Sequence, residues 1–226
     1  MLAFFEKRKI SFASCMKIAS YLALLVGGGI SSLIFPPFKG AVFGYVALIL
    51  SLVFLFKVER VDRKVFWGAY IFGFSFFAVG FSWICNALLI DEESFKAFVP
   101  VVFIAVGAFF GLFVAVPSYL MKWGRNIYSR AIVFCCLMVF FEWVRSFIFT
   151  GFPWNLLGSA LSFDVRLIQG ASVIGTYGLS LLLLLLVSTV SLILLGFWQK
   201  KVYKGAFILL LLLSSEDSIS SISKAW

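Results

Sequence analysis

The segment with the clearest chemical potential is Phe141-Glu142-Trp143-Val144-Arg145, which places an acid and a base three positions apart in apolar surroundings. A spacing of i, i+3 puts both side chains on one helix face, where they can neutralise each other. If the span begins at Ala131, Glu142 lies roughly 17 Å along it, near the middle of the membrane. Two interpretations follow: a structural ion pair that locks the bundle, or a pair that faces a polar cleft and holds a lipid headgroup.

A helix-breaking segment follows directly, Thr150-Gly151-Phe152-Pro153-Trp154-Asn155. Glycine and proline are expected to end the helix at the interface, and aromatic rings favour the depth of the lipid headgroups. The mixed stretch 156–169 is too short to span and is expected to lie along the outer interface. Together with the acid and the base, the predicted substrate-binding residues are Glu142, Arg145, Gly151, Pro153 and Trp154.

Other chemistry is sparse. The chain has no histidine, which removes the commonest general base and the commonest metal ligand. Its four cysteines (Cys15, Cys85, Cys135 and Cys136) lack disulfide or zinc spacing and are expected to be small buried hydrophobic residues. The glycines at 27–29 suit close helix packing better than phosphate binding. No metal or cofactor site is predicted.

The elements that must position these residues are membrane helices. Of 226 residues, 63% are hydrophobic and 13% charged, about half the usual charged fraction. The basic residues stand in short clusters between long uncharged runs, a pattern that favours a lipid bilayer over a nucleic acid as the partner of the +9 chain. We therefore predict an all-α polytopic bundle with six full spans, at 18–35, 41–56, 65–90, 97–121, 131–150 and 172–198.

The distribution of Lys and Arg predicts the orientation. The N-terminal segment and the second, fourth and sixth loops together carry 14 of them, whereas the alternating loops carry three. By the positive-inside rule, the N-terminus is cytoplasmic. The chain then divides into a cytoplasmic segment (1–17), a transmembrane domain (18–213) that ends in an incomplete seventh span (206–213), and a polar, disordered tail (214–226).

The order Glu142-x-x-Arg145, Thr150-Gly151-Phe152-Pro153-Trp154 and Leu157-Gly158 resembles the bacterial apolipoprotein N-acyltransferases. Weaker matches are Phe35-Pro36-Pro37-Phe38, Gly80-Phe81-x-Trp83 and Gly170-x-x-x-x-Gly175-x-x-Gly178-Leu179. The resemblance implies an inner-membrane enzyme of lipoprotein maturation. Such an enzyme moves an acyl chain from a phospholipid to the N-terminal diacylglyceryl-cysteine of an apolipoprotein, through a thioester on a cysteine and with the help of a glutamate and a lysine.

In that family the catalytic triad belongs to a nitrilase-like domain after the membrane spans, and no position here matches it. The expectation is therefore a truncated membrane domain that is inactive alone and carries no catalytic residue. Two alternatives stand beside it: a small transporter that uses Glu142 and Arg145 as its site, and a noncatalytic scaffold. Transporters often contain paired repeats with broken helices, and no convincing repeat is present.

Overall fold

The computed structural model of the chain is a bundle of helices, described for residues 18–36, 38–89, 95–148 and 151–198. After a first helix at Ile18–Ile34, which ends in the 3-10 turn η1 (Ser32–Ile34), the elements are α2 (Ala41–Phe56), α3 (Arg63–Gly80), η2 (Ser82–Leu89), η3 (Lys96–Phe98), α5 (Val99–Leu120), η4 (Met121–Trp123), α6 (Ile127–Arg145), η6 (Leu157–Phe163), α7 (Val165–Ile168) and α8 (Ala171–Trp198). The described residues contain no strand, which confirms the all-α prediction.

Helices occupy all six regions that the sequence predicts to be spans, and α2 has the predicted bounds. By length and composition, three of the helices in the described residues can cross a membrane: Lys96–Trp123, Ile127–Arg145 and Ala171–Phe197. The first helix and α2 are apolar but shorter. α3 begins with Arg63 and Lys64, which lower its hydropathy. A bundle with apolar helices is therefore established, whereas six full spans stay a prediction.

Several predicted features lie outside the described residues. These are the segments 1–17 and 214–226, the incomplete seventh span at 206–213, and Pro37 and Thr150 of the two motifs.

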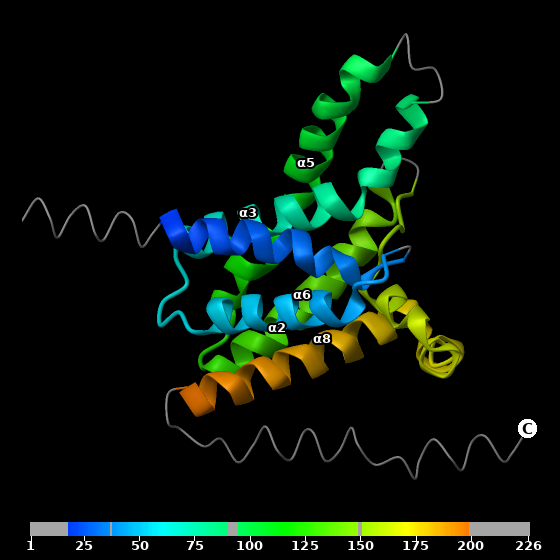
Figure 1. Ribbon diagram of the computed structural model, residues 1–226. Coiled ribbons are helices and arrows are strands. Elements are labelled where there is room, and N and C mark those ends of the chain that lie inside the picture. Colours follow the sequence, from blue (N-terminus) through cyan, green and yellow to red (C-terminus); the bar gives the residue numbers. More distant parts are fainter. Residues whose placement is uncertain (1–17, 37, 90–94, 149–150, 199–226) are drawn as a thin grey trace, which may run out of the picture.

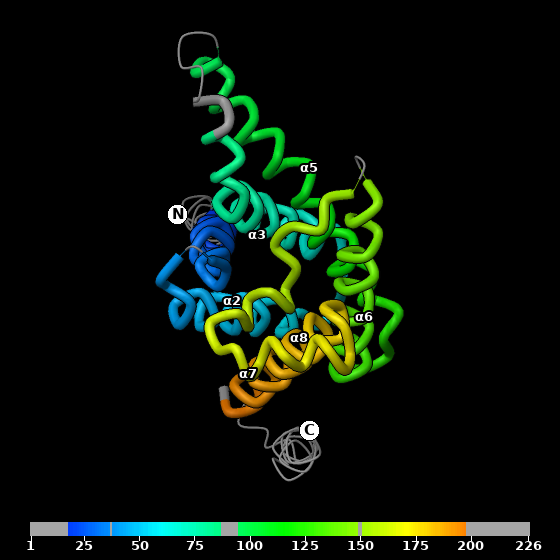
Figure 2. Tube along the Cα trace, turned by 90° about the vertical axis from the view of Figure 1, so that its right-hand side faces the viewer, coloured from blue at the N-terminus to red at the C-terminus, as the bar shows by residue number. Residues whose placement is uncertain are grey.

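The main helices form a ring when the bundle is viewed roughly end-on to α2 and α8 (Figure 2). α3 packs most extensively against α5, while α8 contacts both α2 and α6. The 3-10 segment η2 and the start of α5 project from one side of this ring (Figure 1). Large apolar side chains face outward along the helices, among them Phe43, Val101 and Phe140. An apolar outer surface of this kind suits lipid contact.

Small and polar residues join the helices inside the ring. A side chain at Gly28 would collide with the Phe72 carbonyl and the Ser75 hydroxyl, which confirms close packing of the glycine run against α3. Tyr45 Oη donates to the Ala160 carbonyl oxygen at 3.0 Å, and Ser191 Oγ donates to the Ile49 carbonyl oxygen at the same distance. Such bonds supply polar contacts between helices where water is excluded.

The helix boundaries follow from local capping. Asn126 and Ser129 form a capping box that starts α6 at Ile127, four residues before the predicted start. α6 ends at Arg145, so Glu142 lies about 22 Å along a helix of about 28 Å. Glu142 therefore lies nearer the C-terminal end of its helix than the sequence predicts, because the helix begins and ends earlier than its apolar run. Its depth near the middle of the membrane stays a prediction.

The cysteines are free in the described residues, and they differ in exposure. Cys85 and Cys135 are buried as predicted. The prediction is wrong for Cys136, which is exposed because adjacent helical residues point to different faces.

Candidate functional site

The site loop, defined as residues 151–157, follows α6 and folds back over the end of the bundle. Gly151 has φ +102° and Asn155 has φ 51°, both in the left-handed region that glycine and asparagine tolerate best. Between them, the Phe152 ring packs against Phe81 and Phe110, with ring centroids 5.1 and 5.2 Å away. The Phe152 ring thus anchors the loop in the core, while the left-handed backbone at Gly151 and Asn155 determines the path of the loop.

Arg145 holds the site loop from the inside. It is 1% exposed, and its Nη1 and Nη2 atoms donate to the carbonyl oxygens of Trp154 (2.8 Å) and Asn155 (3.4 Å). The guanidinium carbon also lies 5.2 to 5.9 Å from the ring centroids of Phe77, Phe81 and Phe110. Carbonyl oxygens and aromatic faces both attract a buried cation. They compensate Arg145 for the water that it has lost.

Glu142 binds the same loop two residues beyond Asn155. Its Oε1 atom accepts a hydrogen bond from the Leu157 backbone N–H at 2.7 Å. Its Oε2 atom is buried and has no hydrogen-bond partner among the described residues. A buried carboxylate oxygen without a partner is unusual, and it marks a place where a ligand group or a proton would be stabilised.

The predicted ion pair between Glu142 and Arg145 is wrong. In the described part of the chain, the two side chains do not approach within 4.0 Å of each other, and the ion pair that is present joins the exposed Arg166 and Asp164. The i, i+3 spacing does bring both side chains to one face. Each then binds backbone groups of the folded-back loop, which offers oxygens to the cation and an N–H to the anion.

Two further polar contacts complete the attachment, and the sequence prediction missed both. Asn155 Nδ2 donates to the Gly80 carbonyl oxygen at 2.9 Å, which ties the loop to the end of α3. Ser180 Oγ, on α8, accepts from the Gly158 backbone N–H at 2.8 Å. The position of Asn155 after Pro153-Trp154 was a usable signal, because asparagine tolerates the left-handed turn that such a loop needs. Ser180 lies in an apolar run of the sequence, and nothing in that run indicated its contact with the loop.

The five predicted site residues come together in space, but they face different ways. Glu142 and Arg145 are buried behind the loop, and Gly151 is half-buried in it. Pro153 and Trp154 are exposed. The Trp154 ring meets the Trp83 ring edge to face, with centroids 5.4 Å apart. The charged pair therefore positions the loop, and the proline and the tryptophan form its outer surface.

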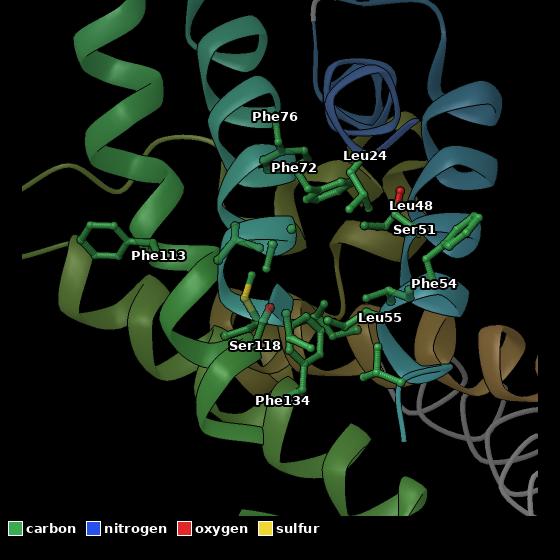
Figure 3. Close-up of a pocket in the computed structure, with 18 of the residues that line it drawn as sticks. Leu24, Leu48, Ser51, Phe54, Leu55, Phe72, Phe76, Phe113, Ser118 and Phe134 are labelled. Atoms are coloured by element: carbon green, nitrogen blue, oxygen red, sulfur yellow. The ribbon is translucent and has the colours of Figure 1, made fainter. Parts of the chain in front are cut away.

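A cavity of about 740 Å³ lies inside the bundle and reaches this site. Glu142, Arg145 and Asn155 line one end of it. Figure 3 shows its apolar middle, formed by side chains from the first helix, α2, α3, α5 and α6 that include Leu24, Leu48, Leu55, Phe72, Phe76, Phe113 and Phe134. Its size falls within the range of about 300–1,000 Å³ that is usual for small-molecule sites.

The chemistry that this arrangement supports is binding. The described residues contain no group of three potential metal ligands. Of the buried thiols, Cys135 faces only the Ser188 hydroxyl at 3.3 Å, and Cys85 faces the Val99 carbonyl oxygen at 3.9 Å. Neither partner is a general base that could activate a nucleophile.

Comparison with known proteins decides the family. Residues 27–190 match the model of the apolipoprotein N-acyltransferase N-terminal domain, and this match includes α2 to α6 and the site loop. The chain belongs to this family. The matched region also contains most of the cavity lining, so the cavity and the site loop lie in the part of this chain that matches the family's N-terminal domain.

Curated relatives carry the same family name. The chain is 36% identical over 172 residues to the apolipoprotein N-acyltransferase of Brucella melitensis biotype 1, covering 71% of this chain and 32% of the relative. It is 35% identical over 161 residues to that of Rickettsia bellii, covering 69% of this chain and 32% of the relative. The chain thus spans about a third of the length of these relatives. The family and the apolar helices make it a membrane protein.

Proposed function

We propose that this chain serves in lipoprotein maturation as the membrane part of an apolipoprotein N-acyltransferase. In that reaction, an ester bond of a membrane phospholipid is cleaved and an amide bond forms between its acyl chain and the α-amino group of a diacylglyceryl-cysteine. The lysophospholipid leaves with the proton that the amine loses. We assign no bond-making residue to this chain. The observation that carries the proposal is the family match over residues 27–190, because it includes the site loop and the two buried charges that hold it.

Within this reaction, we assign the site loop to substrate binding. Pro153 and Trp154 are exposed, so they can contact a lipid or a lipidated peptide at headgroup depth. Gly151 supplies the backbone turn, and Arg145 and Glu142 fix the loop from inside. Preorganisation of this kind lowers the entropic cost of binding a flexible lipid substrate.

The proposed orientation places the N-terminus and the loop at 57–62 in the cytoplasm and the site loop on the outer face of the inner membrane. The transmembrane domain would be 18–213, preceded by the cytoplasmic segment 1–17 and followed by the polar tail 214–226. The asymmetry of Lys and Arg between alternate loops supports this arrangement. Alkaline phosphatase fused after Trp154 should be active, and the same enzyme fused after Arg60 should be inactive. The opposite result would refute the orientation.

The function is tested best in the cell that makes this chain. When its gene is deleted, mass spectrometry of purified lipoproteins should show N-terminal peptides that lack the amide-linked acyl chain. A plasmid copy of the intact gene should restore the acyl chain, a Trp154→Ala copy should restore it poorly, and a Trp143→Ala copy should match the wild type. A plasmid that encodes residues 1–226 alone should not restore it, because we assign no bond-making residue to them. Trp143 is a suitable control because it is 48% exposed on α6 and its ring packs against Phe140 and Phe147, which are not part of the site loop. Lipoproteins with an unchanged N-terminal mass after deletion would refute the proposed function.

A further inference from the structure

The cavity has a second polar end, far from the site loop. Glu59, Arg60, Asp62 and Lys64 line it there, at the turn between α2 and α3. Along α3, Lys64 lies about 20 Å from Phe77, whose ring is in contact with Arg145. An apolar passage therefore runs between two polar ends, and the family match by itself assigns no role to this second end.

The backbone at this second end is held firmly. Arg130 Nη1 donates to the carbonyl oxygens of Val58 (3.3 Å) and Glu59 (3.0 Å). Asp62 caps α3, since its Oδ1 atom accepts from the backbone N–H groups of Lys64 at 2.8 Å and Val65 at 3.4 Å. These bonds fix the backbone of the turn from which the side chains around the opening project.

The basic side chains at this opening are available to a ligand. Arg60 and Lys64 are exposed, and neither forms an ion pair with another described residue. Glu59 is likewise exposed and has no ion-pair partner in the described ranges. Two cations and two anions thus line one opening, so both signs of charge are present there.

A buried hydroxyl lies just inside the opening. Ser118, in the last turn of α5, is 0% exposed and lines the cavity, and its Oγ has no hydrogen-bond partner among the described residues (Figure 3). The ring of its neighbour Tyr119 packs against the Phe66 ring, with the two ring centroids 6.2 Å apart. This contact places the last turn of α5 beside the start of α3. A buried hydroxyl that donates to nothing costs free energy until an acceptor reaches it.

We propose that this end of the cavity binds one phospholipid with a zwitterionic headgroup. Arg60 and Lys64 pair with its phosphate, and Glu59 and Asp62 pair with its ammonium. Ser118 donates to an ester carbonyl oxygen, and one acyl chain fills the apolar passage toward Phe72 and Phe76. No bond is made or broken, so this binding is separate from the proposed acyl transfer at the site loop.

The charge pattern and the passage together favour this occupant over others. An anionic phospholipid would suit Arg60 and Lys64 but would bring its charge close to Glu59 and Asp62. A free fatty acid or a detergent would fill the passage but leave the two acids without a cation. The zwitterionic phospholipid is the one membrane component that satisfies both signs of charge, the hydroxyl and the apolar lining at once.

Binding can be measured by native mass spectrometry of the full chain in a nonionic detergent, with titration of phosphatidylethanolamine or phosphatidylglycerol. We expect tighter binding of phosphatidylethanolamine and roughly tenfold weaker binding after the double change Arg60→Glu, Lys64→Glu. The matched control is Arg63→Glu, Arg125→Glu, because both residues are exposed and neither lines the cavity. Equal affinity of the two lipids, or equal loss in the control, would overturn the proposal.

Photocrosslinking locates the acyl chain. Phosphatidylethanolamine with a diazirine near the end of one chain should label cavity residues such as Leu52, Phe72 and Phe134, and prior change of Ser118→Phe should reduce that labelling. Adducts found only on outward-facing residues such as Val42 and Phe43 would show that the lipid merely coats the bundle. Both measurements detect binding without acyl transfer. Their outcome is therefore independent of whether lipoprotein acylation depends on this chain.

Discussion

The two ends of the cavity use the same kinds of charged residue for different purposes. At the site loop, Glu142 and Arg145 are buried, and each is bound to the backbone of residues 154–157. At the opposite end, Arg60 and Lys64 are exposed, and the turn between α2 and α3 is held by other residues. A buried charge in an apolar bundle can thus hold a loop in place when backbone groups of that loop bind it. An exposed charge remains available to a ligand when other residues hold the backbone around it.

Loss of the buried cation should produce the largest difference in stability between variants at the two ends of the cavity. Arg145→Ala leaves the carbonyl oxygens of Trp154 and Asn155 without their donor, and it leaves Glu142 buried without a nearby positive charge. A buried acceptor left without its donor typically costs about 1–3 kcal/mol, and this substitution leaves two of them. The exposed Arg60→Ala should change the free energy of unfolding by less than about 0.5 kcal/mol. Thermal unfolding in detergent compares the two variants, and similar midpoints for both would contradict the comparison.

Two substitutions of Glu142 distinguish fastening of the loop from pairing with Arg145. Glu142→Gln keeps an oxygen that accepts from the Leu157 N–H, whereas Glu142→Ala leaves that buried N–H unsatisfied at a cost of about 1–3 kcal/mol. We therefore expect the glutamine variant to unfold at a clearly higher temperature than the alanine variant. If both variants lost the same stability, charge pairing would be the main role of Glu142, and the contact with Leu157 would be secondary.

These two outcomes also show what the sequence could and could not reveal. The spacing of Glu142 and Arg145 correctly predicted that they share a face, and apolar runs predicted α2 and α8 almost to the residue. Their partners come from a loop that folds back over the helix end, so local spacing could not predict them. The same holds for Ser118, which stands in an apolar run and becomes notable only because the folded cavity surrounds it.

The left-handed turn of the site loop should produce an intermediate effect. Gly151→Ala places a Cβ at φ +102°, which L residues rarely adopt, and should cost about 1–2 kcal/mol. Gly29→Ala is the matched control, since its Cβ would be 3.6 Å from Val79 in ordinary contact, and the change should be neutral or slightly stabilising in a helix. A Gly151→Ala variant as stable as Gly29→Ala would show that the turn has no fixed conformation.

The exposed pair after the site loop should produce the smallest effect. Arg166 lowers the pKa of Asp164 through hydrogen bonds to its carboxylate. Because the folded-state pKa is the lower one, this contribution to stability is present above the unfolded-state pKa of about 4 and is lost as the pH falls below it. Asp164→Asn keeps a residue that can cap α7, so it should remove this small pH dependence and lower stability near neutral pH only slightly, while stability at low pH stays unchanged. The check is to measure the unfolding midpoints of both proteins from about pH 3 to about pH 7, the range in which the Asp164 carboxyl group titrates.

Amide hydrogen exchange tests most directly whether the site loop is fastened from inside while the opposite turn leaves its charges free. The Leu157 N–H is bound by Glu142 and the Gly158 N–H by Ser180, so peptides that contain them should exchange slowly. Peptides covering residues 59–61 should exchange much faster. Glu142→Ala should accelerate exchange at residue 157, whereas Lys64→Ala should leave it unchanged. If the loop exchanged as fast as residues 59–61 in the unmodified protein, or were indifferent to Glu142→Ala, the account of Glu142 and Arg145 as fasteners would be wrong.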